Sequence, residues 1–182
     1  SACGEIALLC AIAEPNFGLI TNVGRAHLEG FGGVEGVRRG KGELYDYLAA
    51  NGGRAFVRRD DGTLVKMAAE RGNLAVEFYD PAIADGVGHR LEGAFNRLNV
   101  AAAMAVGRYF GVDEERIRDA VAAYRPDNNR SQRRSTARNT LVVDCYNANP
   151  SSMQASLANF LGEESVGGKV AVLGDMLELG AW

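Results

Sequence analysis

The chain has 182 residues, of which 47% are hydrophobic and 24% are charged, and its formal net charge is −3. This composition is ordinary for a globular protein, and the length suits one large domain or one and a part. The sequence has no basic surplus, and no aromatic side chains separate the arginines of residues 130–138, which argues against nucleic-acid binding. No apolar run approaches the roughly 20 residues of a membrane span, and three cysteines without paired spacing indicate a reducing, cytoplasmic setting.

Hydrophobic periodicity alternates between the helical and the strand period over the first 79 residues. Helices that alternate with short, β-branched apolar runs are typical of an α/β fold, in which helices flank a mainly parallel sheet. Pro15 is expected to end the first helix. We predict helices at 4–13, about 34–50 and 63–71, and strands at 17–23, 53–59 and 75–79.

The second half of the chain divides at a polar stretch, residues 125–139, which carries five arginines. Such a composition is typical of an interdomain linker. Asp113 is expected to cap the helix that follows it. We predict helices at 97–111 and 113–124 before the linker, and a strand at 140–144, a helix at about 150–161 and a strand at 169–175 after it, which together form one βαβ unit.

Residues 35–44, EGVRRGKGEL, are similar to a phosphate-binding glycine loop, but three residues instead of four separate the glycines and no Ser or Thr follows Lys41. The segment has a helical period, and Lys41 falls in the middle of its apolar stripe. A lysine on a buried face must be paired, deprotonated or chemically modified, unless its ammonium group snorkels to water. The stripe consists of Val34, Val37, Leu44, Tyr45 and Leu48.

Several polar groups follow predicted strands. His27 comes after the strand at 17–23, and Asp144 and Asp175 end the two strands beyond the linker. Ligands of open α/β sheets gather beyond the carboxyl ends of the strands, so these side chains are candidates for a binding site. The alternative for His27 is a loop histidine that makes an ordinary hydrogen bond.

The helix predicted at about 150–161 begins in the polar stretch Asn147-Ala148-Asn149-Pro150-Ser151-Ser152. Free N–H groups and the positive end of a helix dipole favour a bound anion at such a position. Simple N-capping by Asn149 or Ser151 would explain the same composition.

A set of motifs in one order resembles the Mur ligase family over nearly the whole chain. DCYNANPSSM and VLGDMLELG are similar to motifs of the family member that joins D-alanyl-D-alanine to UDP-N-acetylmuramoyl-tripeptide, and AHLEGFG with KGEL strengthens the likeness. The motifs are TNVGRAHLEGFG (21–32), KGELYDYL (41–48), GAFNRLNVAAAMAVGRYFGV (93–112), NNRSQ (128–132), DCYNANPSSM (144–153) and VLGDMLELG (172–180).

The resemblance implies two catalytic and metal-binding residues. His27 matches the histidine that binds a magnesium ion beside the ATP γ-phosphate, and Lys41 matches the lysine that is carbamylated in this family. Carbamylation converts the cation into a carboxylate-like anion, which could help to hold Mg²⁺.

The resemblance also implies five residues that bind the nucleotide. Asn96 matches the asparagine that contacts adenine, and Arg130 matches the hinge arginine that reaches the ATP phosphates. Asp144 matches the acid that binds the ribose, with Asn147 and Asn149 close to the nucleotide.

The implied chemistry is amide ligation. ATP phosphorylates the terminal carboxylate of the tripeptide, the amine of D-alanyl-D-alanine attacks the acyl phosphate, and phosphate leaves. The protein would contribute positioning and charge neutralisation, as phosphoryl transfer requires. The enzyme is expected to be a cytoplasmic monomer with ATP and Mg²⁺ as cofactors and with no nucleic-acid partner.

The chain departs from the family pattern in several places. No GxxxxGK[ST] loop occurs, and residues 80–93 are shorter than the equivalent stretch of the family. We therefore expect residues 1–127 to form the central ATP-binding domain without its phosphate loop, and residues 128–182 to begin a Rossmann-like C-terminal domain. The phosphate loop would precede Ser1, and the chain alone is expected not to turn over ATP. A sister Mur or folylpolyglutamate-type ligase and a non-catalytic nucleotide-binding module are the alternatives.

Overall fold

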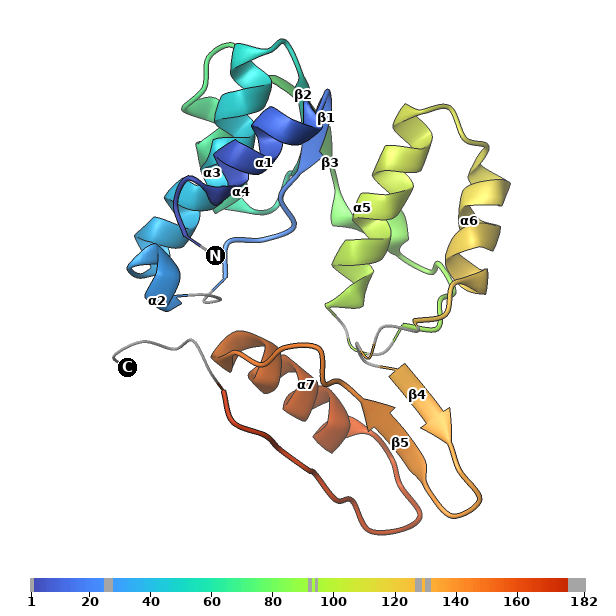
Figure 1. The fold of residues 1–182 in the computed structure, drawn as a ribbon. Helices are drawn as coiled ribbons and strands as arrows, with labels where there is room; N and C mark the ends of the chain where they lie inside the picture. Colours follow the sequence, from blue (N-terminus) through green and yellow to red (C-terminus); the bar gives the residue numbers. More distant parts are fainter. Residues whose placement is uncertain are drawn as a thin grey trace.

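The computed structural model describes residues 2–24, 28–91, 93, 95–126, 129 and 132–176 (Figure 1). Most elements lie within two residues of their predicted bounds, but the first strand ends at Leu19 instead of residue 23. The helices are α1 (Glu5–Ala13), α2 (Leu28–Phe31), α3 (Val34–Ala50), α4 (Gly62–Ala69), the 3₁₀ helix η1 (Pro81–Ala84), α5 (Asn96–Tyr109), α6 (Glu114–Ala123) and α7 (Pro150–Gly162). The strands are β1 (Phe17–Leu19), β2 (Arg54–Arg58), β3 (Ala75–Tyr79), β4 (Gln132–Ser135) and β5 (Thr140–Val143).

The first three strands form a parallel sheet in the order β1-β2-β3. Phe17 pairs with Arg54, and Arg54 pairs with Ala75, so the three strands start in register. α3 connects β1 to β2 and α4 connects β2 to β3, which are the helical crossovers that parallel strands require. The predicted α/β architecture with a parallel sheet flanked by helices is confirmed.

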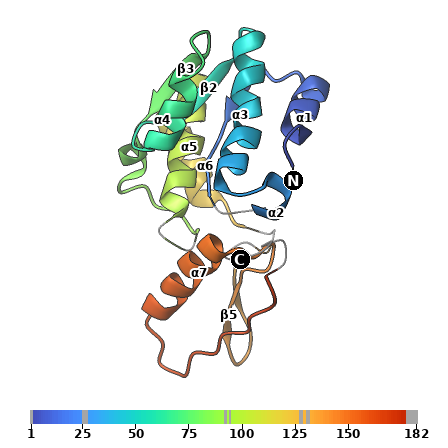
Figure 2. The ribbon, with the colours of Figure 1, turned by 90° about the vertical axis from the view of Figure 1, so that its left-hand side faces the viewer.

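Helices cover both faces of this sheet (Figure 2). Ala55 and Val57 of β2 pack in one buried cluster with α3 and α4, whereas Phe56 between them packs in a second cluster with α5. Successive side chains of a strand point to opposite faces, so the central strand contributes to both cores. This double burial explains why the three central residues of β2 are all apolar.

α2 packs closely on α3 because α3 carries glycines at the contact. A Cβ atom at Gly36 would lie 1.6 Å from the backbone oxygen of Phe31, and one at Gly40 would lie 2.2 Å from Cε1 of the Phe31 ring. Any larger residue would push α2 away and expose Phe31, which is now only 6% exposed. α3 therefore holds α2 in place just after the loop that leaves β1.

The N-terminus of α1 receives its cap from α3. Gly4 provides no side-chain cap, and the Glu43 carboxylate instead accepts hydrogen bonds from the backbone N–H groups of Gly4 (2.6 Å) and Ala7 (2.9 Å). A negative charge at this end of a helix is also favoured by the helix dipole. Glu43 lies two residues beyond Lys41, so α3 contacts both α1 and the loop after β1.

Residues 132–176 contain a β-hairpin followed by a helix, and two predictions for this part were wrong. β4 lies inside the predicted linker and pairs antiparallel with β5, because Thr136 and Asn139 close a tight turn between them. Residues 169–175 are not a strand in the described structure, although residues 170–175 line a pocket together with β5. The predicted βαβ ladder is therefore not formed, since a segment becomes a strand only where it pairs.

No helix in the described part of the chain is long and apolar enough to cross a membrane.

Candidate functional site

Lys41 contacts the loop that leaves the carboxyl end of β1. Its Nζ atom donates a hydrogen bond of 2.8 Å to the backbone oxygen of Asn22. Burial lowers the pKa of the Lys41 amine below its usual value, and no carboxylate of the described residues forms an ion pair with it. A single neutral acceptor compensates a partly buried ammonium group only in part, which is the physical reason for the lowered pKa.

The apolar stripe of α3 explains why Lys41 is held there. Val37, Tyr45 and Leu48 are completely buried, and Lys41 is half-buried between them. The predicted stripe is therefore confirmed except at its first member, Val34, which is 49% exposed. The Lys41 stem is partly buried and its amine bonds the carbonyl group of an exposed loop residue, an arrangement that the snorkelling alternative also explains.

The other residue predicted beside Lys41, His27, lies outside the described residues. The described loop before it, Ile20–Gly24, follows β1 at the carboxyl edge of the sheet, and its Thr21 and Asn22 are exposed. Within the described residues, no group of three or more His, Cys, Asp or Glu side chains could hold a metal ion.

Asn96 begins α5 and is a buried polar residue, with 7% of its surface exposed. Its Oδ1 atom accepts a hydrogen bond of 2.9 Å from Nδ2 of Asn99, one helical turn further on. This bond fixes the orientation of the Asn96 amide. Asn96 was predicted from the sequence and Asn99 was not, although the i,i+3 spacing of the two asparagines places them on one face of the helix.

Asp144 and Asn147 line one cavity of about 600 Å³ between β5, α7 and residues 170–175. Oδ2 of Asp144 accepts a hydrogen bond of 2.7 Å from Oγ of Ser156 on α7, so a second missed residue orients the acid. Asp175, at the end of residues 170–175, lines the same cavity. Three carboxylate or amide side chains therefore line this cavity, and such groups can accept the hydroxyl protons of a sugar.

Asn149 has a different role from its neighbours. It caps α7 through a hydrogen bond from the Ser152 backbone N–H, and the Ser152 hydroxyl accepts one from the Asn149 N–H. This capping box confirms the capping alternative for Asn149. The remaining predicted nucleotide residue, Arg130, lies outside the described residues.

Two family models match the chain. The Mur ligase middle domain matches residues 1–87, and the Mur ligase, glutamate ligase domain matches residues 129–181. The chain belongs to the Mur ligase family. Lys41 lies within the first matched range and Asp144 within the second, whereas Asn96 lies between the two.

Named Mur ligases match almost the full chain. The UDP-N-acetylmuramoyl-tripeptide--D-alanyl-D-alanine ligase of Bacillus subtilis (strain 168) is 29% identical over 99% of this chain and 44% of its own length. The enzyme of the same name from Escherichia coli (strain K12) is 30% identical over 98% of this chain and 45% of its own length. The chain therefore spans less than half the length of these Mur ligases.

Solved Mur ligase structures have the same fold. A crystal structure of MurF from Acinetobacter baumannii matches with a TM-score of 0.83 and 27% identity, over 99% of this chain and 44% of that one. MurF from Thermotoga maritima in complex with ADP matches with a TM-score of 0.81 and 28% identity, over 100% of this chain and 47% of that one.

Proposed function

We propose that the protein containing this chain is an ATP-dependent amide ligase that adds D-alanyl-D-alanine to UDP-N-acetylmuramoyl-tripeptide through an acyl phosphate. The observation that carries this proposal is the likeness of the whole chain to ligases of that name, in sequence and in fold. The enzyme would act as a cytoplasmic monomer. Its central domain would include residues 1–127 and its C-terminal domain residues 128–182, a division that the two matched ranges support.

ATP would supply the phosphoryl group, and several residues of this chain have the chemistry to bind it. The buried Asn96 amide, oriented by Asn99, has donors and an acceptor that suit the edge of a base. Asp144, oriented by Ser156 and accompanied by Asn147, suits ribose hydroxyl groups. The MurF structure that contains ADP supports a nucleotide as the ligand. Arg130 and Asn149 complete the proposed set, although the hydrogen bonds of Asn149 serve α7.

Lys41 is proposed to react with carbon dioxide. The lone pair of the neutral amine attacks the carbon atom, an N–C bond forms, one proton leaves the nitrogen, and a carbamate anion results. The depressed pKa increases the fraction of neutral amine near pH 7, because less of the amine is protonated. The carbamate nitrogen keeps one N–H group. This group is enough to donate the single hydrogen bond to the Asn22 oxygen.

The carbamate fits the requirements of Mg²⁺, a hard cation that prefers oxygen ligands. With His27, Lys41 would form the part of the magnesium site that this chain contributes. Mg²⁺ would neutralise charge on the phosphate oxygens of the nucleotide. The bond from Nζ to the loop after β1 would keep the carbamate at the carboxyl edge of the sheet, where ligands of α/β proteins bind.

Carbamylation can be tested on the chain itself. In ¹³C-labelled bicarbonate, a carbamate resonance is expected in the wild type and should disappear in Lys41→Ala. Lys66→Ala is the matched control, because Lys66 is an exposed lysine on α4 and should not contribute to the signal. A signal that persists in Lys41→Ala, or a wild type without one, would contradict the role of Lys41.

The ligase activity is tested on a protein that includes the remaining part of the enzyme. We expect ATP-dependent ligation of D-alanyl-D-alanine, which Lys41→Ala abolishes and short carboxylic acids partly restore. Normal activity of Lys41→Ala without added acid would refute the catalytic role. ATP-dependent ligation by the 182-residue chain alone would refute the expectation that further residues are needed.

A further inference from the structure

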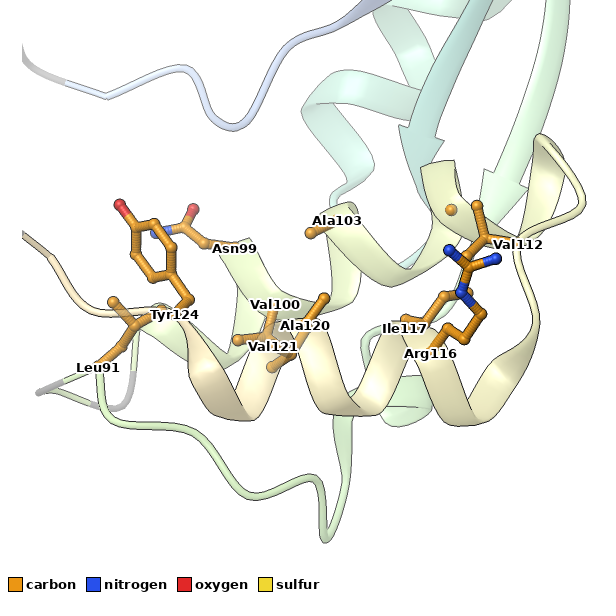
Figure 3. Close-up of a pocket in the computed structure, with 11 residues that line it drawn as sticks. Leu91, Asn99, Val100, Ala103, Val112, Arg116, Ile117, Ala120, Val121 and Tyr124 are labelled. Atoms are coloured by element: carbon orange, nitrogen blue, oxygen red, sulfur yellow. The ribbon is translucent and has the colours of Figure 1, made fainter.

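An open pocket that no proposed step of the ligase uses lies between α5 and α6. The two helices touch where the Ile117 side chain packs on Gly107, at whose position a Cβ atom would lie 3.0 Å from Cδ1 of Ile117. This contact forms one side of a cavity of about 460 Å³, within the range of small-molecule sites. Its walls are almost entirely apolar (Figure 3). The apolar residues include Leu91, Val100, Ala103, Val112, Ala120 and Val121.

The pocket exists because α6 is held by few large side chains. Ile117 is the buried residue of this helix, and Val121 is only partly buried. Ala103 on α5 and Ala120 on α6 line the space between the helices, and a methyl group is too small to fill it. The cavity is therefore built from the backbone spacing and short side chains of these two helices.

Polar groups lie at opposite ends of this apolar surface. Figure 3 shows Arg116 beside Val112 at one end, and Tyr124 with Asn99 at the other. Arg116 and Tyr124 are eight residues apart on one helical segment, a separation of about 12 Å along the axis. A ligand that reaches from one end to the other must therefore be elongated.

Arg116 differs from the other arginines of α5 and α6. Arg97 pairs with Asp85, and Arg108 and Arg118 both pair with Glu114. Arg116 forms no ion pair with any residue in the described part of the chain. Its guanidinium group is therefore available to an anion at the end of an apolar pocket.

We propose that this pocket binds a small amphipathic carboxylate, with its head on Arg116 and its apolar chain between α5 and α6. A guanidinium group holds a carboxylate through two parallel hydrogen bonds, which gives the ligand its orientation. The apolar tail of the ligand would cover Val100, Ala103 and Ala120 and end near Tyr124. The contact of Gly107 with Ile117 closes one side, so a slender chain fits better than a helix of another protein.

Calorimetric titration of the 182-residue chain with decanoate, below its micelle-forming concentration, tests this proposal. Arg116→Gln is expected to weaken decanoate binding about tenfold, because one charge-assisted contact is lost. The affinity for the neutral analogue 1-decanol should change by less than about threefold in the same variant, because no charged contact is lost. Arg118→Gln is the matched control, since it makes the same charge change on α6 at an arginine that pairs with Glu114 and does not line the pocket.

A second variant, Ala120→Phe, fills the pocket and should abolish binding of both probes while circular dichroism shows an unchanged fold. No decanoate binding by the wild type would overturn the proposal. Equal binding by Arg116→Gln, or binding that survives Ala120→Phe, would also overturn it. Self-association of the chain that Ala120→Phe removes would assign the pocket to a second copy instead of a small ligand.

Discussion

Because α2 packs closely on α3, we expect the substitution of glycine by alanine to have opposite effects on stability at two glycines. Gly36 and Gly62 both lie in the first turn of a helix, but a Cβ atom at Gly62 meets nothing within 4 Å, whereas one at Gly36 meets the backbone of Phe31 at 1.6 Å. Alanine increases helix propensity by up to about 1 kcal/mol at either site. Gly62→Ala should therefore stabilise the chain slightly.

At Gly36 the alanine must displace α2, because a backbone atom cannot rotate away as a side chain can. The displacement exposes Phe31, whose burial contributes about 1.5–3 kcal/mol. After the gain in helix propensity of about 1 kcal/mol is subtracted, Gly36→Ala should lower the free energy of unfolding by about 0.5–2 kcal/mol.

Urea denaturation followed by circular dichroism at about 222 nm, where helices dominate the signal, measures both variants. The reasoning is refuted if Gly36→Ala is as stable as Gly62→Ala. A double-mutant cycle adds a check at Gly40, whose added Cβ would meet the Phe31 ring. In a Phe31→Ala background the ring is absent, so Gly40→Ala should stop destabilising the chain.

Further expected outcomes concern single side chains. Tyr45 Oη is buried without a hydrogen-bond partner among the described residues, so Tyr45→Phe should raise the free energy of unfolding by about 1 kcal/mol in urea denaturation, and a loss of that size would contradict the assignment. Asn149→Ala removes the cap of α7 and should cost about 1 kcal/mol by the same measurement, whereas Ser151→Ala should cost little because Ser151 makes no capping bond. The pKa of Lys41 is lower in the native chain than in the unfolded one, so between these two pKa values the unfolded chain binds more protons. In CO₂-free buffer, the free energy of unfolding of the wild type should therefore rise with pH in this window, relative to that of Lys41→Met. Parallel pH profiles of the two proteins would show that Lys41 is not desolvated.

The sequence predicted best those elements whose periodicity is reinforced by burial. α3 and β3 have the predicted bounds, since each has one pattern over its full length. β4 was missed because its residues, QRRS, are polar and become a strand only through pairing with β5. Residues 169–175 were predicted as a strand and are not one. Their apolar run indicates burial, but a strand also needs a neighbouring strand to pair with.

The candidate site was predictable to a similar degree. The stripe of α3 placed Lys41 on a buried face, which the structure confirms. Its bond to the Asn22 carbonyl could not be foreseen, because backbone acceptors are not distinguished by residue type. Ser156 was missed for a related reason, since nothing in the sequence indicates that a serine within a helix faces an acid just beyond a strand.

The cap that Glu43 gives to α1 has a consequence for the order of folding. A helix of nine residues is marginal by itself, and Gly4, the N-cap residue of α1, has no side chain that could cap the first turn. Its first turn depends on a carboxylate 36 to 39 residues away, which is in place only after α3 has formed and the loop between them has closed. α1 should therefore join late, with kinetic φ-values near zero, and its amide protons should exchange faster with solvent than those of α3.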